Sequence, residues 1–354
     1  RSNTRCDILR RVNFKEGTLP VTYLGLPLIT KKLSRSECAP LIERITARAK
    51  SWISKTLSFA GRLQLIKSTL VNMQAYWCSA FLLPGSVVKE CVKVLRTFLW
   101  GKAKGKVKWA EVCKPVEEGG LGVRDLKTWN RVLLLKRVWN ILMNQSLWAK
   151  WCQVYLMKRT NFWELPVSGQ LSWSWRQILR LRPLAKEHIL YVCGNGESFS
   201  LWYDPWLHGE SVHALYGHRV IYDSGLGSQA KVKDVIWQDT CDLIDIQQRV
   251  QVVQITMDHD RIYWGARGQT FSTASAWQLT RSPSSEVTWH AIVWHPMRIP
   301  KHAFSLWLAL RGAHKTKDKL LAAGVIHTDS CIFNCGDGES LAHLFFQCPF
   351  SASI

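Results

Sequence analysis

Residues 331–348 read CIFNCGDGESLAHLFFQC and bring three cysteines and one histidine into a short stretch. Cys331, Cys335, His343 and Cys348 follow the spacing C-x3-C-x7-H-x4-C. Thiolates and imidazoles are the donors that tetrahedral Zn²⁺ prefers, and three thiols with one histidine form a closed structural set. A segment this short buries little apolar surface, so a bound metal would supply its folding energy. The spacing therefore predicts a structural Zn²⁺ site without an open catalytic position, while chance clustering is the alternative because the chain has 11 cysteines.

The charge of the chain is concentrated in its first half. The formal net charge is +21, and residues 1–165 hold 30 Lys and Arg against 10 Asp and Glu, whereas residues 166–354 hold 17 against 16. Such asymmetry indicates a polyanionic partner for the basic half, most simply nucleic acid. A solvated basic surface without a ligand is the alternative, and self-repulsion disfavours it.

Composition excludes several classes of protein. With 354 residues, 47% hydrophobic residues and 19 Trp, the chain is long and apolar enough for two or three folded domains. No apolar run has transmembrane length, so no membrane partner is expected. Cysteines without regular pairing are typical of a reducing compartment, which favours a nuclear or cytoplasmic protein over a secreted one. The sequence contains no Asp-Asp pair, P-loop, H-E-x-x-H or G-x-S-x-G motif.

The first hundred residues predict strands followed by three helices. Residues 8–35, including Val12-Asn13-Phe14, are expected to form short strands and turns, because Pro20, Gly25 and Pro27 exclude a helix. Leu83-Pro84-Gly85 separates the second expected helix from the third. The apolar stripes of the three helices are Leu41, Ile45, Ala49 and Trp52, then Leu63, Ile66, Leu70, Met73 and Trp77, then Val87, Cys91, Leu95 and Phe98.

Basic residues line the outer faces of the first and third helices and the loop after the third. Lysines that alternate with small residues in a Gly-containing loop suit backbone phosphates, although a charged loop is also often only solvated. Trp100 and Trp109 flank this loop and either stack on bases or belong to the core at helix ends. The candidate phosphate-binding residues are Arg44, Arg48, Lys89, Lys93, Arg96, Lys102, Lys104, Lys106 and Lys108.

The rest of the chain predicts mostly helices. Gly119–Gly122 lacks the Lys-Ser/Thr of a P-loop and is expected to be a turn. Asp258 and Asp260 lie in a polar stretch and are expected to face solvent. Helices are expected over 125–143, 146–158 and 173–188, a hairpin over 189–203 around Cys193–Gly196, and a last helical block over 289–323.

Several of these stretches together resemble the C-terminal part of the reverse transcriptase of plant non-LTR (LINE-type) retrotransposons. Leu19–Leu28 is similar to the segment that closes the palm before the thumb. Ser51-Trp52, Ser58–Arg62, Phe98–Gly101 and Gly119–Gly122 are similar to landmarks of the helical thumb and of the segment after it. Trp289–Cys348 resembles the zinc-binding domain of the family, with Trp294, Pro300-Lys301, Phe304, Trp307, Thr316, Leu320, Gly324 and Glu339 beside the four metal-binding positions.

The resemblance implies an α+β fold that is predominantly helical. It implies four regions: a palm-edge remnant at 1–35, a basic thumb-like helical region at 36–115, a Trp-rich connection at 116–285 and a small zinc-binding domain at 286–354. The basic candidates would then hold the backbone of a template–primer duplex, RNA or DNA, without reading sequence. The resemblance does not identify a protein partner.

Two departures from the family accompany the resemblance. The family spaces its first cysteines as C-x2-C, and this chain has an additional residue between Cys331 and Cys335. The chain also begins with Arg1 and ends six residues after Cys348, before a Trp that the family usually shows; we therefore expect a decayed or truncated copy.

The polymerase Asp pair and the ribonuclease H domain are absent from this sequence, which predicts a non-catalytic chain. The alternatives are a protein-interaction module with no nucleic-acid role, or an inert remnant.

Overall fold

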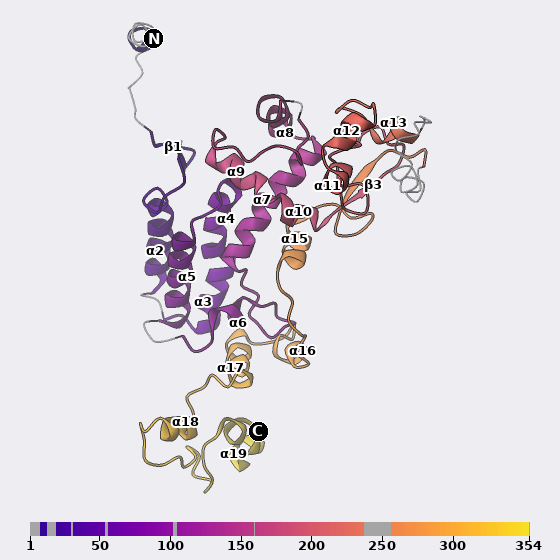
Figure 1. Cartoon of the computed structure of the whole chain (residues 1–354). Coiled ribbons are helices and arrows are strands. Elements are labelled where there is room, and N and C mark those ends of the chain that lie inside the picture. Colours follow the sequence, from indigo (N-terminus) through magenta and orange to yellow (C-terminus); the bar gives the residue numbers. More distant parts are fainter. Residues whose placement is uncertain are drawn as a thin grey trace. The chain divides into compact units, whose positions relative to one another are not determined.

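The computed structural model describes residues 8–12, 19–29, 31–53, 56–101, 105–158, 160–236 and 256–353 (Figure 1). They form two compact units, each built from separated pieces of the chain. The first unit combines Arg1–Pro40, Gln74–Val88 and Leu126–Pro283, and the second combines Leu41–Met73, Lys89–Asp125 and Ser284–Ile354. The described residues are mostly helical with two small antiparallel sheets, as predicted. None of the helices described is long and apolar enough to cross a membrane.

A tight hairpin lies near the beginning of the first unit. β1 (Val21–Tyr23) pairs antiparallel with β2 (Leu26–Leu28) through the turn residues Leu24 and Gly25, whose φ angles are 49° and 78°. Two consecutive positive φ angles are those of the turn that matches strand twist. The hairpin confirms the expected strands here. Residues 8–12 are helical, however, so the strand expected at Val12 is wrong: these residues contain neither Pro nor Gly to oppose a helical turn. Asn13 and Phe14 lie outside the described residues.

The three predicted helices are present. α2 (Ala39–Ile53) and α5 (Gly85–Trp100) bury the predicted stripes, with Leu41, Ile45, Val87 and Cys91 at most 2% exposed. The second helix is interrupted, because a π-helical segment (η1, Ile66–Leu70) separates α3 (Phe59–Leu65) from α4 (Val71–Ala80). A π turn shifts the helical phase by part of a turn. Met73 of the predicted stripe is only half-buried, whereas Leu63, Ile66, Leu70 and Trp77 are buried.

An aromatic cluster forms the core of the second unit. Phe304 of α17 (Pro300–Leu310) lies 5.7 Å from Phe59 and 6.0 Å from Trp100, measured between ring centroids. Trp307 of the same helix donates its indole N–H to the carbonyl of Gly119 at 2.9 Å. This unit also contains α6 (Trp109–Cys113), α16 (His290–Val293), α18 (Lys317–Ala322) and α19 (Pro349–Ala352).

Gly119–Gly122 is a turn, as predicted, and its packing explains the glycines. A Cβ atom at Gly120 would lie 2.0 Å from the carbonyl oxygen of Lys114, which leaves no space for a side chain. Arg311 donates to the carbonyl of Gly119 and forms an ion pair with Glu111 at 3.0 Å. The turn therefore serves packing within the second unit.

Helix α7 (Leu126–Met143) lies at the core of the first unit and confirms the long helix expected there. Trp139 of α7 contacts Trp264 edge-on at 6.3 Å and Phe271 at 5.9 Å. The expected helices over 146–158 and 173–188 appear as shorter pieces. The remaining helices are α8 (Leu147–Trp151), the π-helical η2 (Cys152–Met157), α9 (Trp173–Leu179), α10 (Arg182–Lys186), α11 (Val212–Tyr216), α12 (Arg219–Asp223), α13 (Val232–Ile236) and α15 (Thr273–Thr280).

The strand at Ile189 does not form the predicted local hairpin. β3 (Ile189–Val192) pairs with β4 (Arg261–Trp264), in the register Ile189↔Trp264. Trp264 is 1% exposed in the aromatic core, and this burial outweighs the local turn signal at Cys193–Gly196. The prediction of a hairpin over 189–203 is therefore wrong.

Asp260 also differs from the prediction, because its carboxylate does not face solvent freely. It accepts hydrogen bonds from the backbone N–H groups of Gly194 (2.8 Å), Gly196 (2.9 Å), Ser198 (2.7 Å) and Phe199 (3.3 Å). One carboxylate thus satisfies four backbone donors of the turn after β3. This long-range contact has no signature in a single sequence.

Candidate metal centre

The turn between Cys331 and Cys335 positions two thiols. The N–H of Cys331 donates to the carbonyl of Asp337 at 2.9 Å, and the N–H of Asn334 donates to the carbonyl of Cys331 at 3.0 Å. Asn334 and Gly336 have φ angles of 52° and 96°. Asn tolerates the left-handed conformation better than most residues, and Gly adopts it freely. The additional residue of the C-x3-C spacing is therefore accommodated by a left-handed Asn.

The second half of the cluster is held by a π-helical turn. In η4 (His343–Gln347), the N–H of Cys348 donates to the carbonyl of His343 at 2.8 Å, which closes an i to i+5 turn. In a π turn, residues five apart lie near one another on the helix surface. The H-x4-C spacing separates His343 and Cys348 by this same number of residues.

The structure brings the four predicted ligands together. One ligand atom from each of Cys331, Cys335, His343 and Cys348 lies within 4.8 Å of all the others. The Sγ atoms of Cys331 and Cys348 are 3.9 Å apart, and Cys335 Sγ lies 3.1 Å from His343 Nε2. Ligands at Zn–S and Zn–N bond lengths around a tetrahedral ion are separated by about 3.5 to 3.8 Å. The donor set and its spacing therefore fit a tetrahedral Zn²⁺ ion.

Two neighbouring groups lie close to the ligands. The carboxylate of Asp337 lies 3.9 Å from Nδ1 of His343, on the side of the ring away from the thiols. The N–H of Phe333 approaches Cys331 Sγ at 3.4 Å. Sequence reasoning did not consider Asp337, an acid two positions after the second cysteine that lies near His343 in the folded chain.

Glu339 connects the cluster to the rest of the C-terminal module. Glu339 is 7% exposed, and its side chain accepts the N–H of Lys317 at 3.1 Å, at the first residue of α18. The Nζ atom of Lys317 donates to the carbonyl of Ser330 at 2.7 Å, directly before the first cysteine. These hydrogen bonds therefore join the cluster to α18.

Several cysteines outside the cluster are core residues. Burial raises the pKa of Cys38 and of Cys152 to about 11, and that of Cys193 to about 12. These thiols remain protonated at neutral pH, and a protonated thiol is a poor nucleophile and metal ligand. They contribute apolar packing.

Two thiols of the cluster have pKa values shifted in opposite directions. Burial raises the pKa of Cys348, but hydrogen bonds with the backbone of Ser351 and Phe350 and with the thiols of Cys335 and Cys331 together lower it below its ordinary value. A hydrogen bond from the backbone of Asp337 lowers the pKa of Cys335, and burial together with the neighbouring thiols raises it by more. Thiols this close disfavour several negative charges at once, and a bound cation removes that repulsion.

The described basic candidates lie on the second unit, on the exposed faces of α2 and α5 and in the loop before α6. Arg48 stacks over Trp52 at 5.2 Å, and the ammonium of Lys106 lies 5.0 Å above the ring of Phe59. Arg44 and Arg48 line a hollow of about 540 Å³ with Ser51, Thr69 and Met73. Lys102 and Lys104 lie outside the described residues. The described candidates, all exposed, are Arg44, Arg48, Lys89, Lys93, Arg96, Lys106 and Lys108.

The tryptophans at the ends of the loop differ from one another. Trp100 is 6% exposed and contacts Phe59 at 5.8 Å, so of the two alternatives it belongs to the core. Trp109 is half-buried at the start of α6. Base stacking by Trp100 is therefore excluded.

Comparison with known proteins supports the zinc-binding region predicted from the sequence. Residues 271–354 match the protein family described as "zinc-binding in reverse transcriptase". The chain is 30% identical over 361 aligned positions to the "Putative ribonuclease H protein At1g65750" of Arabidopsis thaliana, an alignment that covers 93% of this chain. It is 28% identical to the "Uncharacterized mitochondrial protein AtMg00310" of the same plant, over 39% of this chain and 95% of that protein.

The chain spans 57% of the length of the first of these relatives. The matched zinc-binding family and the two plant relatives confirm the resemblance to plant LINE-type reverse transcriptases.

Proposed function

We propose, from its relationship to plant LINE-type reverse transcriptases, that this chain binds nucleic acid through a basic surface and carries a structural Zn²⁺ ion. Cys331, Cys335, His343 and Cys348 would hold the metal. The observation that carries the metal assignment is the convergence of their four donor atoms within 4.8 Å. A closed set of four protein ligands supplies folding free energy to the module and leaves no position for substrate.

The basic surface of α2, α5 and the loop before α6 would contact phosphates. Within the described residues, none of Arg44, Lys89, Lys93 or Arg96 forms an ion pair with a carboxylate, so their charges remain available. Their positions on the outer faces of packed helices present several cations on one fixed backbone. Phosphate contacts of this kind position a duplex without selecting a sequence.

The regions implied by the resemblance belong to this proposal. A palm edge at 1–35, a thumb at 36–115, a connection at 116–285 and a zinc-binding domain at 286–354 would handle a template–primer in the complete polymerase. We further propose that this chain has no catalytic role of its own. Among the described residues, the Cys3His cluster is the one group of three or more Cys, His, Asp and Glu side chains close enough to hold a metal.

Salt dependence tests the binding of nucleic acid. Binding of a labelled RNA–DNA duplex should weaken by about 10³-fold or more between about 50 and 200 mM salt if six or more phosphates are contacted. Changing Lys89, Lys93 and Arg96 together to Ala should lower the affinity for the duplex. It should also make the plot of log affinity against log salt concentration less steep. A matched control changes three exposed cations of the C-terminal region, Lys301, Lys315 and Lys319, to Ala. Equal losses in both variants would refute the assignment to α5.

Zinc content tests the metal site. Purified protein should contain about one Zn²⁺ per chain, and Cys331→Ser and Cys335→Ser should each lower that ratio. Cys38→Ser is the control, because Cys38 is buried far from the cluster in sequence and is a protonated core thiol. An unchanged zinc ratio in the cluster variants would refute the proposed metal site.

The name of the first relative also calls for a cleavage assay on an RNA–DNA hybrid with Mg²⁺. We expect this assay to show no activity.

One observation favours a second function, a protein-interaction role for the zinc module. Four apolar side chains around the cluster are exposed, and Phe333 stacks on Phe350 at 4.4 Å. A protein partner held by such residues would respond weakly to salt, in contrast to a phosphate backbone. The exposed side chains are Ile332 (63%), Phe333 (41%), Phe346 (61%) and Phe350 (53%).

A further inference from the structure

The two-stranded sheet formed by β3 and β4 has one buried and one exposed face. Ile189, Tyr191 and Trp264 point into the core, where each is at most 6% exposed. Because side chains alternate along a strand and pairs across it share a face, Leu190 and Tyr263 lie together on the other side, as do Val192 and Arg261. The exposed face therefore presents an aromatic ring next to a guanidinium group.

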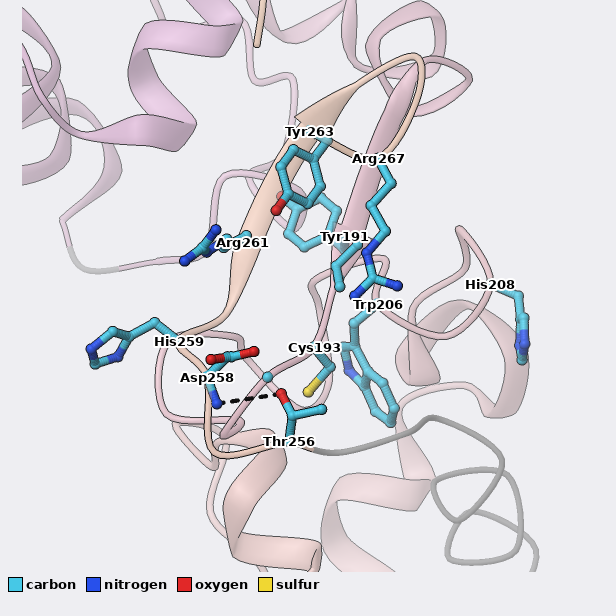
Figure 2. A pocket seen from close by; sticks show the side chains of 12 residues that line it. Tyr191, Cys193, Trp206, His208, Thr256, Asp258, His259, Arg261, Tyr263 and Arg267 are labelled. Carbon is cyan, nitrogen blue, oxygen red and sulfur yellow. Dashed lines mark hydrogen bonds between the residues drawn. The ribbon is translucent and has the colours of Figure 1, made fainter. Parts of the chain in front are cut away.

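This face borders a hollow of about 490 Å³. Arg261 and Tyr263 of β4 line it, together with Arg267 from the turn after β4 and Trp206 (Figure 2). Figure 2 shows Arg261 and Arg267 on either side of Tyr263. Neither arginine forms an ion pair with a carboxylate in the described part of the chain. A hollow of this volume matches the size of small-ligand sites in proteins.

The rim of the hollow is held in place by Asp260. Its carboxylate binds the backbone of Gly194 and Gly196, and Gly194 itself lines the hollow. The negative charge of Asp260 is therefore engaged by backbone donors. Asp258 also lines the hollow and offers a carboxylate that can accept a hydrogen bond from a sugar hydroxyl or a base amino group.

We propose that this hollow binds one nucleotide unit of a single-stranded nucleic acid, with the base against Tyr263 and the adjacent phosphates at Arg261 and Arg267. Aromatic rings stack on bases of any sequence, and guanidinium groups bind phosphate through paired N–H donors. Residues two apart on a strand are separated by about 6.6 Å, which is comparable to the rise of an extended single strand. The site rests on the proposed nucleic-acid function and adds to it a single-strand contact in the other unit.

The experiment measures fluorescence anisotropy of labelled oligo(dT) and oligo(U), each about 12 nucleotides long, and of a duplex of equal length, at low salt. Arg261→Ala with Arg267→Ala, and separately Tyr263→Leu, should weaken single-strand binding about tenfold, the size expected for loss of one stacked base or its phosphate contacts. Arg131→Ala with Arg219→Ala is the matched control: both are exposed, lie in the same unit and remove the same charge. The control should change affinity by less than about twofold. Circular dichroism shows whether each variant is folded.

A second readout locates the contact directly. An oligonucleotide with 4-thiouridine should crosslink to the peptide that contains Tyr263, and mass spectrometry identifies the residue. If the arginine pair and its control lose equal affinity and the crosslinks lie elsewhere, this site is refuted while the proposed function stands. If neither duplex nor single strand binds, the proposed function fails as well. If only the α5 variant loses duplex binding, the two sites act separately, as proposed.

Discussion

The buried amide of Asn130 gives the sharpest stability prediction. It lies on α7, is 1% exposed, and accepts the N–H of Leu83 at 2.8 Å. Its Nδ2 atom donates to the carbonyls of Cys78 and Phe81, each at 2.8 Å. The three backbone groups lie where α4 ends and the chain turns toward α5. One side chain therefore satisfies the open backbone groups of that helix end.

Asn130→Leu keeps the approximate size of the side chain and removes all three hydrogen bonds. Each buried backbone group left without a partner costs about 1 to 3 kcal/mol, and the apolar side chain returns about 1.5 to 3 kcal/mol. The net loss should be about 3 kcal/mol, a large fraction of the about 5 to 15 kcal/mol that holds a typical domain. Asn140→Leu is the control, because it makes the same change on the same helix at a half-buried position.

Asn130→Asp separates the donor from the acceptor role. The introduced carboxylate retains the bond from Leu83 but faces two carbonyl oxygens, so the folded state favours its protonated form. The pKa of this carboxyl is thereby raised above its unfolded value of about 3.9, and the penalty should grow as the pH rises above about 4. Equilibrium urea unfolding, followed by tryptophan fluorescence and circular dichroism at pH 5 and pH 8, measures both effects. A loss below about 1 kcal/mol for the Leu variant, or equal stability of the Asp variant at both pH values, would show that these bonds do not hold the helix end.

The second unit gives four further expected outcomes. Phe304→Ala should destabilise that unit by about 3 to 5 kcal/mol through the cavity left between Phe59 and Trp100, measured by urea unfolding. Gly120→Ala should destabilise it too, because the new Cβ meets the Lys114 carbonyl, and proteolysis rates would report the change. Asn334→Val should weaken Zn²⁺ retention against a chelator relative to Asn334→Gly, since the left-handed φ disfavours a β-branched residue. Acidification should release Zn²⁺, because protons compete for the thiolates, and a metal indicator would follow the release.

The features that depend on local periodicity or on donor chemistry are predictable from the sequence. The stripes of α2 and α5, the helix α7, the glycine turn and the metal cluster are each encoded by residues close in the chain. The π-helical turn at His343–Gln347, which brings the His and Cys of the H-x4-C spacing together, was seen only in the structure. Metal ligands have strict type and spacing, so they can be recognised without knowledge of the fold.

Features that depend on long-range pairing are not predictable from one sequence. The Cys193–Gly196 turn indicates a local hairpin, and β3 instead pairs with a strand some seventy residues later, because Trp264 belongs to the aromatic core around Trp139. In the sequence, Asp260 stands in a polar stretch that is typical of a solvated acid. Its four backbone partners lie in a loop far away along the chain, so no local signal predicts them. The left-handed conformation of Asn334 was likewise not predictable. The C-x3-C spacing shows that the turn has an additional residue, but not which backbone conformation accommodates it.

The positive charge is distributed differently over the folded units than over the two halves of the sequence. In the sequence the excess of Lys and Arg lies in residues 1–165, which indicates one basic half. The two units divide that half between them: the first holds 26 Lys and Arg against 15 Asp and Glu, and the second holds 21 against 11. Each unit is therefore strongly basic, although residues 166–354 are nearly neutral. A polyanion is attracted by the charge of a surface and not by its order in the chain. The basic helices of the second unit and the Arg261–Arg267 hollow of the first thus both lie on units that attract nucleic acid, so the salt dependence of the whole chain should exceed that of either site alone.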